Sequence, residues 1–171
     1  MRLVDRRWLA FATAAVFSST AAFAQFFSPD PEWRESKVPP PPAFDVKRLL
    51  FVESPVASSL KFGIDPDTLV ITPDGVVRYV MAALGPTGAQ NVFYEGIRCN
   101  TGEYRIYARH NPESGWSTVA DSDWRSIKGS AATRHALSFA LSAVCTGAAP
   151  TSPVSAIVHA LRTGVAPGMN Q

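Results

Sequence analysis

From Lys47 onward, short apolar stretches alternate with turn-forming residues, which is the pattern of an antiparallel β-meander. Pro73-Asp74-Gly75 favours a tight turn because proline restricts one backbone angle and glycine frees the next, and Asn100-Thr101-Gly102 favours another. The predicted strands are residues 49–53, 60–64, 68–72, 76–83, 92–99 and 104–109.

Beyond residue 130 the apolar spacing changes from 2 to about 3.6, so helices are expected to replace strands. The first predicted helix runs from Ser130, its cap, to about Cys145. The second begins at Ser152 and Pro153, with the serine as cap and the proline in the first turn, and ends at Gly164. Strands followed by helices predict an α+β fold, an antiparallel meander sheet with C-terminal helices packed on one face.

The first 24 residues are typical of an export signal. A basic start with Arg2, Arg6 and Arg7 precedes an apolar core at residues 8–17, and Ala22-Phe23-Ala24 provides the small residues of a cleavage site. We therefore expect cleavage before residue 25, a periplasmic location and, with no cysteine near that point, no lipid anchor. The expected organisation is a signal peptide (1–24), a proline-rich lead-in (25–45), one α+β domain (46–164) and a tail (165–171).

The lead-in contains six of the fourteen prolines, including four in succession at residues 39–42. Proline lacks a backbone N–H and favours polyproline II, so this segment is expected to be a stiff, exposed spacer that Trp33 or Phe44 can pin to the domain. A docking site for a proline-reading partner is the alternative interpretation.

Charge narrows the range of partners. The chain has 16 basic and 14 acidic side chains, of which three arginines and one aspartate lie in the leader, so 13 of each remain after cleavage. This balance provides no field that would steer the protein onto polyanions. No apolar run outside the leader approaches the roughly 20 residues that span a bilayer. We expect neither a nucleic-acid partner nor a membrane span.

Export also decides how the two cysteines are interpreted. In an oxidising compartment Cys99 and Cys145 are expected to form one structural disulfide. A reactive thiol would need a second cysteine or a placed histidine nearby, and the local sequence offers neither.

A bond from Cys99 to a helical Cys145 would place Phe93, Glu95 and Ile97 on the helix-covered face of their strand. A buried carboxylate needs a partner. Pairing residue 76 with residue 97 sets Arg78 opposite Glu95, which predicts a structural ion pair that holds the register. A catalytic role for Glu95 is the alternative.

The opposite face is expected to be uncovered and to carry tyrosines and arginines. Such side chains bind glycans by stacking and anions by forked hydrogen bonds, and the alternative interpretation is ordinary cross-strand pairing on a half-wet sheet. The residues of this candidate binding surface are Tyr79, Tyr94, Arg98, Arg105, Tyr107 and Arg109.

Motifs for metal, cofactor or nucleophilic chemistry do not emerge from the sequence. His110, His135 and His159 are scattered, the last two off the apolar stripes of their predicted helices. Asp65 and Asp67 suit turn capping better than a calcium loop. We expect no metal and no cofactor, and nothing in the sequence argues for an enzyme.

Several of these segments resemble a known family. They are Asp74-Gly75-Val76-Val77-Arg78-Tyr79, Asn91-Val92-Phe93-Tyr94-Glu95-Gly96-Ile97-Arg98-Cys99, Tyr107-Ala108, Trp116, Trp124-Arg125 and Cys145. Together they are similar to the cryptic neisserial protein-like (CNP-one-like) family of exported bacterial envelope proteins, over roughly residues 49–145. The resemblance implies a Gram-negative periplasm or envelope and carries no assigned activity.

Three functional hypotheses remain open. The leading one is a non-enzymatic exported protein that binds an envelope protein or cell-wall component through the tyrosine and arginine face. A cell-envelope hydrolase with an acidic site around Glu95 is the second, and it requires a deep cleft with another acid or His135 within hydrogen-bond reach. A structural subunit of an envelope assembly is the third, marked by a contiguous apolar patch.

Overall fold

The computed structural model describes residues 32–52, 58–120 and 122–167, so the predicted signal peptide lies outside the described residues. The strands are β1 (Leu50–Val52), β2 (Lys61–Ile64), β3 (Val70–Ile71), β4 (Val76–Leu84), β5 (Gln90–Arg98), β6 (Glu103–Asn111), β7 (Gly115–Thr118), β8 (Arg125–Ser126), β9 (Cys145–Thr146) and β10 (Ala149–Pro150). The helices are α1 (Arg134–Phe139) and α2 (Val154–Thr163), with a π-helical turn at Ala140–Val144 and 3-10 turns at Val46–Arg48, Pro66–Thr68 and Ala131–Thr133.

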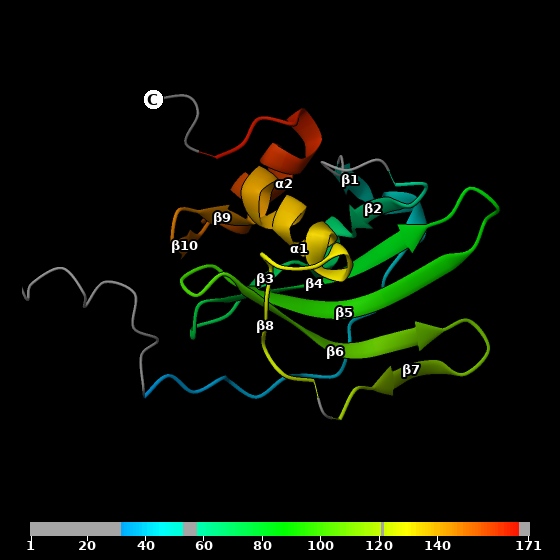
Figure 1. The fold of residues 1–171 in the computed structure, drawn as a ribbon, viewed down its shortest axis with the longest axis horizontal. Coiled ribbons are helices and arrows are strands. Elements are labelled where there is room, and N and C mark those ends of the chain that lie inside the picture. Colours follow the sequence, from blue (N-terminus) through cyan, green and yellow to red (C-terminus); the bar gives the residue numbers. More distant parts are fainter. Residues whose placement is uncertain (1–31, 53–57, 121, 168–171) are drawn as a thin grey trace, which may run out of the picture. The chain divides into compact units, whose positions relative to one another are not determined.

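One antiparallel sheet dominates the domain, with the order β1-β2-β4-β5-β6-β7 and with β3 beside β4 and β8 beside β6. The strands β9 and β10 form a separate small hairpin. Figure 1 shows α1 and α2 on one side of the long strands and the extended N-terminal segment, in blue, on the other. The α+β fold predicted from the sequence is confirmed, and β7 to β10 are additions to the predicted strands.

The pairing of β4 with β5 corrects the predicted register by one residue. Tyr79 lies opposite Glu95, and Arg78 lies opposite Gly96. Because side chains alternate between the faces of a strand, this shift moves Arg78 away from Glu95, and the predicted Arg78–Glu95 ion pair is wrong. The observed register buries Tyr79 and Met81 completely beneath the helices, where the predicted one would have exposed them.

A bulge in β6 changes the faces of its residues. Tyr94 lies opposite Ala108 while Glu95 lies opposite Ile106, so Tyr107 is the extra residue on β6. As a consequence Arg105, opposite Gly96, and Arg109, opposite Phe93, point to different sides of the sheet.

The helix-covered face carries the larger core. Ile64, Val77, Tyr79 and Ile97 from the sheet pack against residues of α1, the π-helical turn and α2 such as Phe139. The predicted disulfide between the ends of β5 and the π-helical turn is confirmed, with its two cysteines 46 positions apart in sequence and their Cα atoms 5.6 Å apart. It joins the sheet to the helical layer covalently.

The boundaries of the helical segments differ from the predictions in detail. The segment from Ala131 to Val144 is helical throughout, as 3-10, α and π turns in succession, with Ser130 as its extended cap, and Cys145 already begins β9. In α2, Pro153 is itself the extended residue before the helix (ψ 176°), so neither a Ser152 cap nor a proline inside the first turn is present. Gly164 ends the helix in the left-handed region, as predicted.

Candidate binding site under the N-terminal strap

The second face of the sheet is covered by residues 33–46, here called the strap. The strap contains no helix or regular strand up to the 3-10 turn at Val46–Arg48. Its Val38, Phe44 and Val46 pack on a second apolar cluster that includes Val80 and Tyr94. Both Trp33 and Phe44 pin the segment, as expected, but the prediction of an exposed spacer is wrong for the described part of the lead-in, residues 32–45, which folds back over the sheet.

The beginning of the strap is held by Trp33 and by Asp74. The guanidinium of Arg98 lies 3.5 Å from the centroid of the Trp33 ring, and the indole N–H donates to the Asp74 carbonyl over 3.0 Å. The Asp74 carboxylate accepts from the backbone N–H and the hydroxyl of Ser36, at 2.7 and 3.0 Å. Burial tends to raise the pKa of Asp74, but hydrogen bonds from Thr72 and Ser36 outweigh it and lower the pKa.

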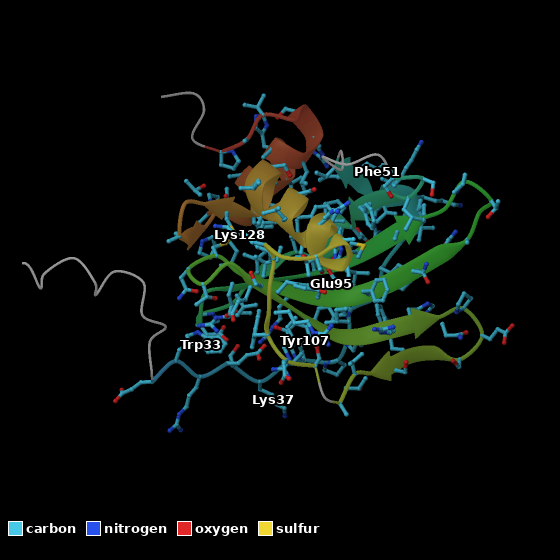
Figure 2. All side chains as sticks on the ribbon, viewed as in Figure 1. Trp33, Lys37, Phe51, Glu95, Tyr107 and Lys128 are labelled. Carbon is cyan, nitrogen blue, oxygen red and sulfur yellow. A yellow bond between two sulfur atoms is a disulfide. The ribbon has the colours of Figure 1, made fainter. Side chains whose placement is uncertain are left out.

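Glu35 is the centre of the polar network between the strap and the sheet. Its Oε1 accepts from the Tyr107 hydroxyl at 2.6 Å and from Arg78 at 3.4 Å, and its Oε2 accepts from Arg105 at 2.8 Å. Two arginines therefore share one carboxylate that is only 12% exposed. Figure 2 shows Tyr107, Lys37 and Trp33 on the strap side of the sheet.

Arg78 recognises the backbone of the strap. Its side chain is 3% exposed, and it donates to the carbonyls of Ser36 at 2.9 Å and Lys37 at 3.3 Å. These carbonyls have no partner in a ladder, because the strap pairs with no strand. The arginine that was expected to balance Glu95 across the strands instead satisfies an extended segment on the other face.

Gly96 provides the space for this network. A Cβ atom at this position would lie 2.6 Å from the Tyr107 hydroxyl and 2.9 Å from Val76 Cγ1. Any side chain would therefore displace the Tyr107 ring or the neighbouring strand. The absence of a side chain at Gly96 allows the Tyr107 hydroxyl to reach Glu35.

The six residues of the predicted binding surface do not lie together on one exposed face. Tyr79 is fully buried on the helix side, and Arg109 is exposed on that same side with its guanidinium 5.5 Å from the Phe93 centroid. The other four share the second face, but three of them are buried under the strap: Tyr94, Arg98 and Tyr107 are 3%, 7% and 6% exposed. The predicted bare surface is therefore wrong.

Three of the predicted residues do meet around a hollow. The space, about 480 Å³, lies between the strap and the sheet, and we call it the strap hollow. Its lining consists of Lys37, Val38, Pro39, Pro40, Pro41, Tyr94, Arg105, Tyr107, Ala108, Thr118, Val119 and Ala120. No carboxylate is among these residues, while Arg105 remains 30% exposed. The hollow thus combines a basic group, two aromatic side chains and a wall of prolines.

The tyrosines of the hollow are hydrogen-bond donors at neutral pH. Burial raises the pKa of Tyr94. Burial and the hydrogen bond to Glu35 together hold the pKa of Tyr107 far above its ordinary value. Tyr107 therefore keeps its proton and donates a hydrogen bond to the Glu35 carboxylate.

A larger groove, about 810 Å³, lies at the C-terminal side of the domain. It is lined by Thr146, Ala149, Pro150, Thr151, Ser152, Ser155, Ala156, His159, Ala160, Val165, Ala166 and Pro167. This lining holds hydroxyls and one imidazole but no Lys, Arg, Asp or Glu. The strap hollow is the better candidate site because binding sites in proteins combine an apolar wall with a few convergent polar groups.

Glu95 has a different partner from the predicted one. His135 Nε2 lies 3.1 Å from Glu95 Oε2 and 3.2 Å from Oε1, and the Tyr79 hydroxyl donates to Oε2 at 3.5 Å. Glu95 is 0% exposed and His135 8%, so the histidine expected off the apolar stripe is buried. Figure 2 shows Glu95 under the helical layer.

The electrostatics of this pair favour a structural ion pair. Burial acts to lower the pKa of His135, but the charge of Glu95, its hydrogen bond and a further hydrogen bond to the Ala132 backbone raise it more. The imidazole therefore interacts with acceptors at Glu95 and Ala132, which stabilises its cationic form. Burial and the charge of Glu95 hold the pKa of Tyr79 well above its ordinary value.

The sequence missed Glu35, Ser36 and Asp74 as strap partners, and it named His135 beside Glu95 only as a requirement of the hydrolase hypothesis. Glu35 contacts Arg105 and Tyr107, which are 70 and 72 positions away. The tryptophan and phenylalanine within a proline-rich segment were the signal that the segment docks. Within the part of the chain that the structure describes, no group of three or more His, Cys, Asp or Glu side chains is placed to hold a metal ion.

Comparison with known proteins places this architecture in a family. Neither the curated proteins nor the solved structures include a significant match to the chain. The sequence model of the CNP1-like family matches residues 28–162, a span that includes the strap, the whole sheet and nearly all of α2. The chain belongs to the CNP1-like family.

Proposed function

We propose that this protein is an exported, non-enzymatic binding domain of the bacterial cell envelope, and that it binds its partner in the strap hollow. The observation that carries this proposal is the position of Arg105. Arg105 lines a hollow whose described lining residues include no carboxylate, and the acceptor that it contacts among the described residues, Glu35, is shared with Arg78. A basic group with unused donors beside aromatic and proline side chains suits an anionic partner.

Export to the periplasm is supported by two features. The first 24 residues have the pattern of a signal peptide. The Cys99–Cys145 disulfide is a bond that persists in oxidising compartments and is rare in the cytosol. Among the helices of the described residues, none is long and apolar enough to cross a membrane.

Binding is favoured over hydrolysis by the surroundings of Glu95. His135 does lie within hydrogen-bond reach of Glu95, as an enzyme would require. However, Glu95 and Tyr79 are both 0% exposed, so substrate cannot contact the carboxylate in this conformation. A general acid or base must reach the group it protonates or deprotonates, directly or through one water.

The test of the proposed function is capture of a partner from envelope extract with the purified mature protein. Arg105→Gln removes the guanidinium charge from the sheet side of the hollow. Arg109→Gln is the matched control, because Arg109 lies on the same strand, is exposed and points to the other side of the sheet. We expect a component retained by the wild type and by Arg109→Gln to be lost with Arg105→Gln.

The captured component is then identified by mass spectrometry and its affinity for the purified protein measured by calorimetry. Equal retention by both variants, with thermal unfolding of each unchanged, would contradict binding in the hollow.

A structural subunit is the second candidate, because large apolar side chains, among them those of Phe51 and Leu141, are exposed on the surface. Phe51 in β1 is 48% exposed and Leu141 in the π-helical turn is 68% exposed. Native mass spectrometry of the mature protein separates the two candidates. A monomer supports the binding domain, and a defined oligomer that Leu141→Ser dissociates supports the subunit.

A further inference from the structure

The strap hollow has donors and acceptors on separate sides. On the sheet side, the hydrogen bond shown for Arg105 goes from Nη1 to Glu35, which uses one of the five N–H donors of a guanidinium. Its Nε is buried and has no acceptor within the described chain. Arg78 also pairs with Glu35, so two positive charges on the sheet side share the single negative charge of this carboxylate. The sheet side is therefore suited to a further carboxylate.

The strap side of the hollow can only accept hydrogen bonds along most of its length. Pro39, Pro40 and Pro41 line it, and proline has a carbonyl but no backbone N–H. A ligand that faces these residues must therefore supply donors. Hydroxyl groups are such donors, and a peptide, which carries as many carbonyls as N–H groups, matches this wall less well.

The remaining surface of the hollow is apolar. Tyr94, Tyr107, Val38 and Ala108 line it together with the proline rings. The volume of about 480 Å³ lies within the range of roughly 300–1,000 Å³ found for small-molecule sites. A pyranose ring presents an apolar C–H face that packs on such a wall, while its hydroxyls lie around the rim.

We infer that the strap hollow is a binding site for a saccharide that carries a carboxylate. The inference rests on the proposed function and names its ligand class. The carboxylate pairs with Arg105, and the hydroxyls donate to the carbonyls of residues 39–41. The ring packs mainly on the prolines, because Tyr94 and Tyr107 are only 3% and 6% exposed. Lys37, an exposed residue of the lining, adds a second positive charge.

Two sugars that differ in the carboxylate test the inference. N-acetylmuramic acid carries a lactyl carboxylate on the same ring as N-acetylglucosamine, which has none. Binding to the mature wild-type protein is measured by NMR titration, with Arg105→Gln as the test variant and Arg109→Gln as the control. We expect the acidic sugar to bind at least about tenfold more tightly than the neutral one, the effect of losing one charge-assisted hydrogen bond.

The same titration locates the ligand. Arg105→Gln should reduce affinity for the acidic sugar by about tenfold, and Arg109→Gln should leave it unchanged. Backbone resonances of Lys37, Val38 and residues 118–120 should shift, because these residues line the hollow. Resonances of Ser155 and His159 in the C-terminal groove should stay in place.

Three outcomes overturn the inference. Equal affinity for the two sugars would contradict recognition of the carboxylate. Resonance shifts confined to the C-terminal groove would contradict binding in the strap hollow. If neither sugar binds, the ligand is not an acidic saccharide. The last outcome is distinct from failure of the proposed function, since Arg105-dependent capture of another envelope component would still support a binding domain.

Discussion

The two faces of the sheet are closed in different ways. On the helix side, large apolar residues such as Tyr79, Ile97 and Phe139 are completely buried, and one ion pair, Glu95–His135, lies among them. On the strap side, a smaller apolar cluster is surrounded by a network in which Arg78, Arg105 and Tyr107 all bind Glu35.

The difference follows from what each cover does with its own backbone. A helix satisfies its internal N–H and C=O groups itself and can offer an apolar stripe. The strap pairs with no strand, so its polar groups need partners from the sheet. Arg78 and Asp74 supply them. A sheet face that is covered by an extended segment must therefore carry polar side chains. The arginines and tyrosines that bind the strap can for this reason also contact a ligand.

The largest effect is expected from His135→Leu, which breaks the helix side. It leaves the Glu95 carboxylate buried without its cation, and removal of one partner of a buried pair costs about 3–5 kcal/mol. Urea unfolding measures the loss. The double variant Glu95→Gln/His135→Leu should recover part of it, since no charge is then buried. A loss below about 1 kcal/mol in the single variant would show that the pair is not an ion pair.

The next effect is expected from Cys99→Ser/Cys145→Ser, which removes the link between the sheet and the helical layer. A bridge across 46 residues stabilises by roughly 4 kcal/mol in the chain-entropy description, and measured losses are often smaller. Unfolding under oxidising conditions gives the value. Hydrogen exchange should increase in α1 and the π-helical turn but not at Ser36. If amide exchange became equally faster at Ser36 and in α1, the two faces of the sheet would not be stabilised independently of each other.

Arg78→Gln breaks the strap side. The variant leaves the carbonyls of Ser36 and Lys37 without their arginine donor and removes one of the two donors to Glu35 Oε1, which we expect to cost about 2–3 kcal/mol. Limited proteolysis should cut the strap faster, while amide exchange in α1 stays as in the wild type. Arg109→Gln, exposed on the other side, is the control and should change neither. An unchanged cleavage rate in Arg78→Gln would contradict the recognition of the strap by this arginine.

Gly96→Ala tests how tightly the strap side is packed by adding a single carbon atom beside Tyr107. The added Cβ would meet the Tyr107 hydroxyl and Val76, and such overpacking costs typically about 1–3 kcal/mol. Thermal unfolding of the variant measures the cost. Gly85→Ala is the matched control, because its nearest neighbours would lie at ordinary contact distances of 3.5 Å or more. Similar stability of the two variants would show that Tyr107 is not tightly positioned.

The smallest effect is a pH dependence confined to the helix side. The pKa of His135 is raised in the folded protein, so the pair contributes fully below the ordinary histidine pKa of about 6.5. That contribution is lost as pH rises through the raised pKa. The stability difference between the wild type and Glu95→Gln/His135→Leu should therefore narrow with increasing pH, measured by urea unfolding. If the stability difference widened with increasing pH, the pKa of His135 would be lowered in the folded protein and not raised.

Local pattern in the sequence was enough to predict much of the fold. Turns such as Pro73-Asp74-Gly75 and the change from strand to helix spacing are encoded within a few residues, so the meander and the order of elements followed. The disulfide followed from two cysteines and the expected compartment. The register did not, because residues 85–89 form a loop long enough to allow either pairing of β4 with β5.

The sequence by itself determined which chemistry the protein carries: an α+β domain, one disulfide, and strands rich in tyrosine and arginine. Only the tertiary structure decided how those side chains are used. The register of β4 with β5 and the bulge at Tyr107 determine on which face of the sheet each side chain lies. Glu35 contacts Arg105, which is 70 positions away in the sequence. Such contacts depend on the sum of packing over both faces, which no short stretch of sequence contains.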